Sequence, residues 1–414
     1  MEVMTKNKKE VLVPTLRFKE FGGEWIKDKV GSIGNFKGGG TPSTDKSEYW
    51  EGDIPWVSSS DVSEGEVSNP NITRFLTNKA IAESATKIIP KDSVLFVSRV
   101  GVGKLAVSKE ELCTSQDFAN LILEKDSSYF IAYYFIARNK LLHRYSQGTS
   151  IKGFTTGDLK SIPINLPSLS EQQKIASFLS AVDEKIHQLT KKKELLEQYK
   201  KGVMQQLFSQ KLRFKDKNGN EFPDWEERKL SHYLTVSKNK NEALKYDKND
   251  VLSVSGEFGI VNQIEFQGRS FAGASVHNYG LVESGDIVYT KSPLKTNPYG
   301  IIKVNKNKPG IVSTLYAVYK CKPTVIGAYL DYYFQLDDNT NRYLRPLVQK
   351  GSKNDMKINN EKVLIDPIMI PSTIEEQQKV VDYLEELDSK IALANNQITQ
   401  TQTYKRGLLQ KMFV

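Results

Sequence analysis

Two long segments without proline decide the fold of this chain. Residues 170–208 read SEQQKIASFLSAVDEKIHQLTKKKELLEQYKKGVMQQLF, and residues 373–412 read TIEEQQKVVDYLEELDSKIALANNQITQTQTYKRGLLQKM. Apolar residues recur there with alternating gaps of three and four, the spacing of a coiled-coil seam. The seam positions of the first segment are Leu179, Val182, Ile186, Leu189, Leu196, Val203 and Leu207, with Lys193 and Lys200 in two further slots. Adding 205 gives the second seam, Leu384, Leu387, Ile391, Ala394, Thr401, Leu408 and Met412, with Ile398 and Lys405 at the lysine slots.

Both segments are expected to form long helices. Ser170 and Thr373 are the expected N-caps, and Glu171 and Glu376 fall in the first turn, where the helix dipole favours negative charge. A single apolar stripe is equally compatible with a helix packed on a globular core. Two copies in the same register favour pairing of the two helices with each other.

The helices belong to a tandem duplication of the chain. Leu16-Arg17-Phe18-Lys19 recurs as Leu212-Arg213-Phe214-Lys215, and a tryptophan follows each copy, Trp25 and Trp225. Glu171-Gln172-Gln173-Lys174 recurs as Glu376-Gln377-Gln378-Lys379, each after a proline-serine pair. Between these edges the copies diverge into short runs of Val, Ile, Phe and Tyr broken by Gly, Pro, Asn and Ser, which indicates mixed sheet with long loops. Two explanations are compatible with this divergence: random sequence drift between the copies, or adaptation of the copies to different targets.

Connectivity then predicts the architecture. We expect an α/β (α+β) protein with two mixed-sheet domains separated by a long antiparallel two-helix coiled coil, a pseudo-two-fold internal repeat in one chain. The expected parts are residues 1–168 for the first domain, 169–210 for the central helix, 211–372 for the second domain and 373–414 for the C-terminal helix.

Composition indicates a cytoplasmic protein with a polyanionic partner. Lys and Arg exceed Asp and Glu by 9, with a pI near 9.1, which favours nucleic acid. Cys113 and Cys321 are the two cysteines, so a disulfide framework is not expected. No apolar run approaches the roughly 20 residues that cross a bilayer, and no signal peptide is recognisable.

Polar loop residues at corresponding places in the two domains are the candidate DNA contacts. Arg reads guanine, Gln and Asn read adenine, Asp accepts from cytosine, and Lys and Ser contact phosphates. Each of these residues is also compatible with an ordinary solvated loop. The candidates are Ser58, Ser59, Ser60, Asp61, Ser98, Arg99, Lys104, Gln116, Asp117 and Lys152 in the first domain, and Ser253, Ser255, Lys291, Ser292, Lys295, Lys350, Lys353 and Asn354 in the second.

Catalytic and metal-binding patterns are expected to be absent from this chain. Gly101-Val102-Gly103-Lys104-Leu105 lacks the earlier glycine and the following Ser or Thr of a phosphate loop. Asn297-Pro298-Tyr299 resembles an amino-methyltransferase motif without its second proline. The four histidines have no Cys or His neighbours at metal-ligand spacing. The sequence indicates a non-enzymatic protein without a metal site.

In combination these motifs resemble the specificity subunits of type I restriction-modification systems. The residues that carry the resemblance are Leu-Arg-Phe with its tryptophan, Gly39-Gly40-Thr41-Pro42-Ser43, Gly52-Asp53-Ile54-Pro55-Trp56-Val57, Ser98-Arg99-Val100-Gly101 and the two Glu-Gln-Gln-Lys helices. The second domain lacks the Gly-Asp-Ile-Pro-Trp segment and has Val251-Leu252-Ser253-Val254-Ser255-Gly256 instead, so contacts carry over less securely there.

The resemblance implies two target-recognition domains that read a bipartite, asymmetric site in double-stranded DNA. It also implies two methyltransferase subunits as partners, and restriction subunits bound through them. S-adenosylmethionine, ATP and Mg would then belong to those partners, and no cofactor to this chain. The alternative is a coiled-coil scaffold or adaptor whose helices and lobes bind other proteins.

Overall fold

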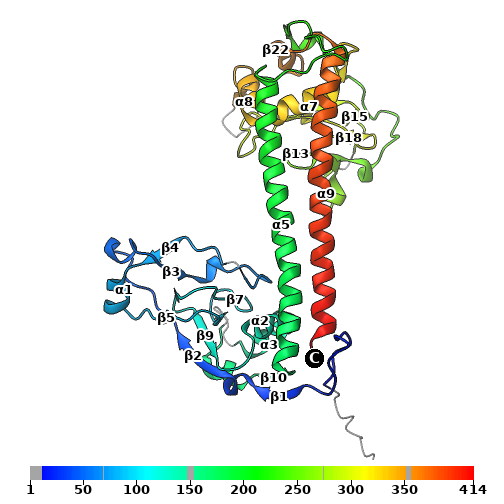
Figure 1. Ribbon diagram of the computed structural model, residues 1–414. Coiled ribbons are helices and arrows are strands. Elements are labelled where there is room, and N and C mark those ends of the chain that lie inside the picture. The colour runs from blue at the N-terminus through cyan, green and yellow to red at the C-terminus, as the bar shows by residue number, and fades with distance from the viewer. Residues whose placement is uncertain (1–11, 69, 147–152, 274, 351–355) are drawn as a thin grey trace, which may run out of the picture. The chain divides into compact units, whose positions relative to one another are not determined.

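The computed structural model describes residues 12–68, 70–146, 153–273, 275–350 and 356–414 (Figure 1). Among the helices of these residues, none is both long and apolar enough to cross a membrane.

The chain forms two compact units that divide both long helices between them. Unit 1 comprises residues 1–191 and 395–414, and unit 2 comprises residues 192–394. Helix α5 (Leu169–Phe208) and helix α9 (Ile374–Met412) therefore each contribute residues to both units. The four-part division expected from the sequence stays a prediction.

Helices α5 and α9 run antiparallel, as one ion pair in each unit shows. In unit 1, Lys405 of α9 lies 2.6 Å from Asp183 of α5. In unit 2, Lys200 of α5 lies 2.6 Å from Asp388 of α9. The start of one helix thus meets the end of the other. The two lysines are the residues that the sequence places in seam slots, and both are 8% exposed.

The seam residues point inward in both units. Near the helix ends they join the hydrophobic core of their own unit, as expected of a helix that packs on a globular core. The buried seam residues are Leu179, Leu189, Val203, Leu207, Leu384, Leu387, Ala394, Leu408 and Met412, and the half-buried ones are Val182, Ile186, Leu196, Ile391 and Ile398.

The helix starts differ slightly from the expected caps. Helix α9 begins after Thr373, whose hydroxyl accepts from the Glu376 amide at 3.3 Å, as the sequence predicts. Helix α5 begins at Leu169, two residues earlier than a cap at Ser170 would give. The hydroxyl of Ser168, and not that of Ser170, accepts from the Glu171 amide, at 3.4 Å.

Unit 1 is built on two four-stranded sheets. One has the order β2-β9-β6-β7 and is antiparallel; the other has the order β4-β3-β8-β5, and its β3–β8 pair is parallel, so it is a mixed sheet. Strand β1 pairs with β10 beside the start of α5. The elements are β1 (Ile26–Lys29), β2 (Gly34–Gly38), β3 (Ile54–Val57), β4 (Arg74–Leu76), α1 (Asn78–Glu83), β5 (Ile88–Ile89), β6 (Val94–Val97), β7 (Leu105–Val107), β8 (Leu112–Thr114), β9 (Phe118–Leu123), α2 (Ser128–Ala137), α3 (Asn139–Tyr145), α4 (Thr156–Ser161) and β10 (Pro163–Leu166).

Unit 2 repeats the antiparallel sheet with the corresponding order β12-β19-β16-β17. Its other strands form the pairs β11–β22, β13–β14, β15–β18 and β20–β21, and a parallel contact is made by the bridge between Val251 and Ile311. The elements are β11 (Glu226–Lys229), β12 (Leu234–Val236), β13 (Leu252–Ser255), β14 (Gly259–Asn262), α6 (Gln263–Gln267), β15 (Gly280–Val282), β16 (Ile287–Thr290), β17 (Ile302–Val304), β18 (Gly310–Val312), β19 (Tyr316–Cys321), α7 (Gly327–Gln335), α8 (Asp337–Leu344), β20 (Gln349–Lys350), β21 (Met356–Lys357) and β22 (Pro367–Ile370).

The repeated sequence motifs meet in space and fix how each unit packs on its long helix. The Arg17 guanidinium donates two hydrogen bonds of 2.7 Å to the Glu171 carboxylate. Arg213 makes the same pair with Glu376, at 3.0 and 2.9 Å. Each Leu-Arg-Phe lead is therefore tied to the first turn of the helix that closes its own repeat.

The glutamine that follows each of these glutamates links the long helix to the segment that precedes a shorter helix of the same unit, α2 or α7. The side-chain oxygen Oε1 of Gln172 accepts from the backbone amide of Ser127 at 3.0 Å, just before α2. The side-chain oxygen Oε1 of Gln377 accepts from the backbone amide of Ile326 at 2.9 Å, just before α7. The first two residues of each Glu-Gln-Gln-Lys motif are at most 1% exposed, so they act in packing and cannot form a partner surface.

Lys303 in strand β17 is a buried cation, which makes the stability of unit 2 depend on pH. The side chain is 6% exposed. Burial lowers its pKa; Asp331 partly opposes this, and Lys306 and Lys200 add to it. The unfolded chain, in which the pKa of lysine is near 10.4, then binds more protons than the folded chain, so stability rises with pH between the lowered value and about 10.4.

Lys303→Met is therefore expected to raise the free energy of unfolding by about 1 kcal/mol near pH 7 and to flatten its rise toward pH 10. Urea unfolding of both proteins across this pH range measures the effect. A variant that is less stable than the parent at pH 7, with the same pH slope, would show that the charged ammonium is accommodated without cost.

Candidate nucleic-acid interface

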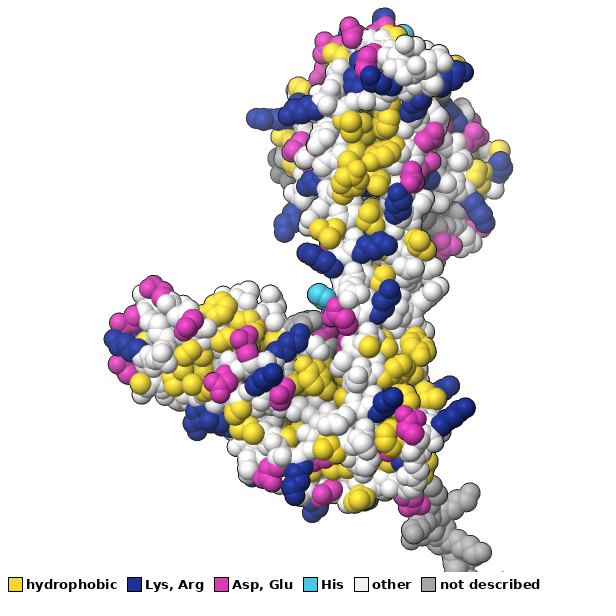
Figure 2. Space-filling view, viewed as in Figure 1, with side chains coloured by type: hydrophobic (Ala, Val, Ile, Leu, Met, Phe, Trp, Pro, Cys, Tyr) yellow, Lys and Arg dark blue, Asp and Glu magenta, His cyan; other side chains and the backbone are white. Residues whose placement is uncertain are grey.

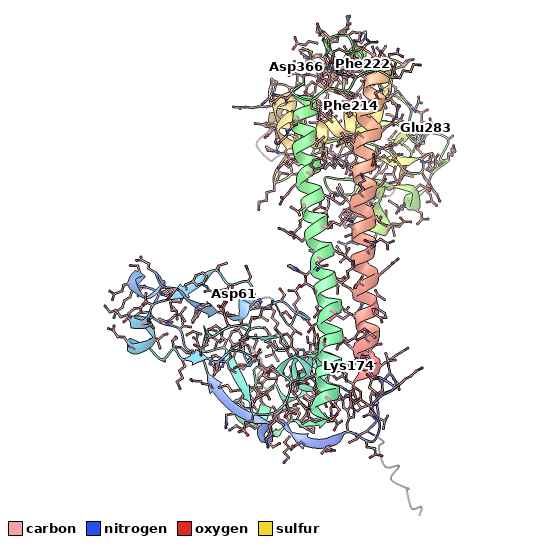
Figure 3. All side chains as sticks on the ribbon, in the orientation of Figure 1. Asp61, Lys174, Phe214, Phe222, Glu283 and Asp366 are labelled. Carbon is pink, nitrogen blue, oxygen red and sulfur yellow. The ribbon has the colours of Figure 1, made fainter. Side chains whose placement is uncertain are left out.

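The first candidate surface is the turn that follows strand β3 in unit 1. Ser58 begins a short turn in which its amide and hydroxyl donate to the Asp61 carboxylate at 2.7 and 2.8 Å. Ser60 is exposed and lies 2.8 Å from the Ser58 hydroxyl, whereas Ser59 is buried. Figure 3 shows Asp61 on the strand-containing part of the unit, away from α5. Ser58, Ser60 and Asp61 thus form one hydrogen-bonded network, and their contact with DNA stays a prediction.

Arg74 completes this network and was not found by sequence reasoning. It lies opposite Trp56 on the neighbouring strand β4, with its guanidinium carbon 4.3 Å from the centre of the Trp56 ring. Its Nη2 donates to Ser58 Oγ and to Asp61 Oδ2, both at 2.6 Å. The only sequence signal was one charged residue inside the strand-like run Ile72-Thr73-Arg74-Phe75-Leu76, which does not reveal its cross-strand partner.

These contacts keep Asp61 ionised. Burial alone would raise the pKa of its carboxyl, but the hydrogen bonds from Ser58 and Arg74, together with the Arg74 charge, lower it overall. A carboxylate held in this way can accept hydrogen bonds, for example from an exocyclic amino group of a base.

The second candidate surface is the loop between strands β6 and β7. Val100, Gly101 and Gly103 have φ values of 47°, 118° and 100°, the left-handed region that residues other than glycine rarely adopt. Val100 is also 61% exposed. The Lys104 ammonium lies 3.4 Å from the backbone carbonyl of Ser59 in the turn after β3. The β6–β7 loop and this turn are therefore neighbours.

The remaining candidates of unit 1 have mixed surroundings. Ser98 is buried and donates to the Asp117 carbonyl at 2.8 Å, which gives it a structural role. Arg99 is exposed, and its backbone forms a bridge with Gly153. Gln116 is exposed and accepts a hydrogen bond from the Thr41 hydroxyl, within the Gly-Gly-Thr-Pro-Ser segment. Lys152 lies outside the described residues.

In unit 2 the candidates fall into two groups. Ser253 is buried and accepts from Gln263 at 3.2 Å, and Ser255 caps a turn by accepting from the amides of Glu257 and Phe258. Both therefore serve the β13–β14 hairpin.

The loop between β16 and β17 holds the second group. Ser292 and Lys295 are exposed there. Lys291 is half-buried, and burial lowers its pKa, an effect that the Glu361 charge opposes. Lys350 belongs to strand β20, and Lys353 and Asn354 lie outside the described residues.

The positive charge is not gathered in one place on the face that Figure 2 shows. Lys and Arg side chains lie there among Asp and Glu side chains on both units. The candidate contacts are consequently defined by loop geometry and not by a large basic patch on this face. Among the described residues, no group of three or more His, Cys, Asp or Glu side chains could hold a metal ion.

Comparison with known proteins identifies relatives over part of the chain. Residues 23–198 match the family model described as type I restriction modification DNA specificity domain. The type I restriction enzyme MjaIX specificity subunit of Methanocaldococcus jannaschii is 33% identical over 231 residues, which are 53% of this chain and 53% of that protein. The type I restriction enzyme EcoR124I/EcoR124II specificity subunit of Escherichia coli is 32% identical over 183 residues, 42% of this chain and 44% of that protein. The chain thus spans about half the length of these curated relatives.

The likeness in fold covers nearly the whole chain. The crystal structure of a type I restriction-modification system S subunit from M. genitalium superposes with a TM-score of 0.59, covering 97% of this chain and 99% of that one at 15% sequence identity. At this identity the match shows the fold alone.

Proposed function

We propose that the chain is a type I restriction-modification DNA-specificity subunit and that it reads a bipartite, asymmetric site in double-stranded DNA for such a system. In this role it contributes no catalytic group. It directs an adenine methyltransferase and an ATP-dependent restriction subunit to the site, and it works in the cytoplasm.

The observation that carries this proposal is a repeated scaffold with dissimilar loops. Both units contain the same four-stranded antiparallel sheet, and both tie their leading arginine to a buried glutamate on the closing helix. The residues beside the sheet differ: unit 1 presents the network of Ser58, Asp61 and Arg74, whereas unit 2 has the β13–β14 hairpin. Two readers with one scaffold and different loops suit two unlike half-sites.

Two methyltransferase subunits are proposed as partners, one for each repeat, because a repeated surface binds the same partner twice. The buried Glu-Gln pairs leave the other residues of the motif for this surface, including the exposed Lys174 at the start of α5 (Figure 3) and its half-buried counterpart Lys379. S-adenosylmethionine would belong to these partners, and ATP and Mg to the restriction subunits. Titration of the chain with its methyltransferase should saturate at two copies, and saturation at one copy would contradict the proposal.

Mapping of methylated adenines tests the main proposal. Genomic DNA of a host that carries the system should show a two-part adenine-methylation motif with two unlike halves, and deletion of the gene for this chain alone should abolish it. A motif that survives the deletion would exclude the proposed role. The adaptor alternative predicts no salt-sensitive binding of mixed duplex DNA by the chain together with its methyltransferase.

Arg74→Ala is expected to weaken binding to the mapped duplex about tenfold, since one lost base contact costs about 1–3 kcal/mol. The variant removes the two hydrogen bonds that Arg74 donates, to Ser58 and to Asp61, and uncovers the Trp56 ring. Fluorescence anisotropy with the methyltransferase present measures the affinity. Lys79→Ala, which removes an exposed cation of α1 paired with Glu48 at 3.0 Å, is the matched control. Equal affinities of the two variants would exclude a role for Arg74 in DNA reading.

A further inference from the structure

Helices α3 and α8 occupy the same place in the two units, beside the loop that joins the third and fourth strands of the repeated sheet. Asn139 and Leu142 of α3 correspond to Asn341 and Leu344 of α8, 202 residues later in both cases. Both leucines are fully buried in the core of their own unit. One face of each helix is therefore anchored in the same way.

Both asparagines lie against the neighbouring loop, and Asn341 is hydrogen-bonded to it. Asn341 donates to the Thr296 carbonyl in the β16–β17 loop at 2.9 Å. In unit 1, a Cβ added to Gly103 of the β6–β7 loop would lie 2.6 Å from Asn139 Oδ1 and 3.0 Å from His143 Nε2. A glycine is required there, because its φ of 100° and this close approach both exclude a side chain. Each candidate base-reading loop thus rests directly on its helix.

The solvent-facing side of both helices carries two cations one turn apart. In α3 these are Lys140 and Arg144; in unit 2 they are Arg342 in the last turn of α8 and Arg345, which caps the end of that helix, and all four are exposed. Lys140, Arg144 and Arg345 have no ion pair or hydrogen bond from their side chains among the described residues. Arg342 donates to Asn339 at 2.8 Å. These cations are available for an external anion.

In unit 2 the cations of the helix and of the loop converge. Lys295 of the β16–β17 loop lines one hollow together with Arg342 and Arg345 of α8. Tyr299 and Asn341 also line it, and Asp338 is its one acidic residue. Three cations against one carboxylate around a solvent-open hollow favour an anionic ligand.

Stabilisation of the helix dipole explains only part of this arrangement. Arg144 lies in the last turn of α3, Arg342 lies in the last turn of α8 and Arg345 caps that helix, so all three interact favourably with the negative end of a helix. Lys140, however, is the second residue of α3, near the positive end, where a cation is disfavoured. The dipole therefore gives no reason for Lys140.

We propose that α3 and α8 are the phosphate-contacting helices of the two recognition domains. Lys140 and Arg144, and likewise Arg342 and Arg345, bind the sugar-phosphate backbone beside the bases that the adjoining loop reads. Because the loop packs against the helix, by the close approach of Gly103 to Asn139 in unit 1 and by the Asn341–Thr296 hydrogen bond in unit 2, the backbone contact sets where the loop enters the groove. This inference rests on the proposed DNA-reading function and adds an anchor that carries no sequence information.

The salt dependence of DNA binding tests it. The full chain with its methyltransferase is titrated into a fluorescent duplex that carries the mapped methylation motif and into a scrambled duplex, at several NaCl concentrations. K140A/R144A and R342A/R345A are compared with K27A/K29A, which removes two exposed cations from strand β1. Each helix variant should reduce the slope of log affinity against log salt by about 1.8, because each phosphate contact contributes about 0.9. Both duplexes should be weakened by the same factor, so that their affinity ratio is unchanged.

Three results would overturn the inference. A helix variant with the slope of K27A/K29A would show that its cations do not contact phosphates. A changed affinity ratio at an unchanged slope would assign them to base reading instead. If a double variant has a lowered melting temperature, single glutamine substitutions such as Arg342→Gln are measured in its place. A salt slope equal to that of the wild type in these single variants would also overturn the inference. Failure of the parent complex to bind either duplex would contradict the proposed function itself, which is a separate outcome.

Discussion

Replacement of Arg213 by alanine is expected to lower the free energy of unfolding of unit 2 by about 3–5 kcal/mol, the cost of leaving a buried charge without its partner. The Glu376 side chain is 1% exposed and receives two hydrogen bonds from Arg213 and one from the Trp225 indole at 3.1 Å. Without the guanidinium, the carboxylate stays buried with a single neutral donor. Urea unfolding followed by tryptophan fluorescence measures the loss.

Two further variants separate the buried charge from simple truncation. Lys215→Ala removes an exposed ion pair with Glu221, at 3.0 Å, and should cost less than about 1 kcal/mol. Arg213→Ala combined with Glu376→Gln should recover part of the stability, because a neutral amide needs no counter-charge and can still accept from Trp225. If R213A were no more destabilising than K215A, the arginine would not be compensating a buried charge.

Asp388→Ala is expected to lower the free energy of unfolding by about 1–3 kcal/mol, less than R213A, because Lys200 is buried but the Asp388 side chain is 42% exposed. Lys200 is 8% exposed and loses the carboxylate at 2.6 Å, while the Tyr332 hydroxyl loses its acceptor at 2.7 Å. Gln335, at 3.2 Å, remains as a neutral acceptor for the ammonium. Denaturant titration of unit 2 should show a lower midpoint with an unchanged slope.

Two control variants show whether the cost of D388A comes from the Lys200 charge that is left without its partner. Glu386→Ala breaks an exposed pair with Lys390 on the same helix and should cost about 0.3–0.5 kcal/mol. The apolar double variant K200M/D388L should regain most of the stability, because a well-packed apolar pair often replaces a buried ion pair without loss. A D388A protein as stable as E386A would mean that Lys200 reaches solvent.

The elements that repeat or follow a regular period could be predicted from the sequence. The apolar seam and the tandem duplication follow a regular period and repeated motifs, so the sequence alone reveals them. The fold class inferred from them is confirmed by the structure. The network around Asp61 was not predicted: its turn is local, but Arg74 reaches it only through the pairing of β3 with β4.

Burial decided what the sequence could not. Ser98 and Ser253 are polar residues in promising loops, yet both are buried and serve the backbone or a neighbouring strand. Glu171 looked like a surface residue of a helix start, but its partner Arg17 lies 154 positions earlier in the chain. Polarity alone does not distinguish a solvated side chain from one that is paired by a long-range contact.

The last twenty residues of the chain complete the fold of the unit that is translated first. Phe413 is buried against Trp25 and Phe130, with ring centres 6.3 and 5.4 Å away, and the Lys411 carbonyl accepts from the Leu16 amide at 2.9 Å. A nonsense mutation that removes residues 395–414 would therefore spare every residue of unit 2 and damage unit 1. The part of unit 1 formed by residues 1–191 would thus remain incomplete until residues 395–414 have been synthesised.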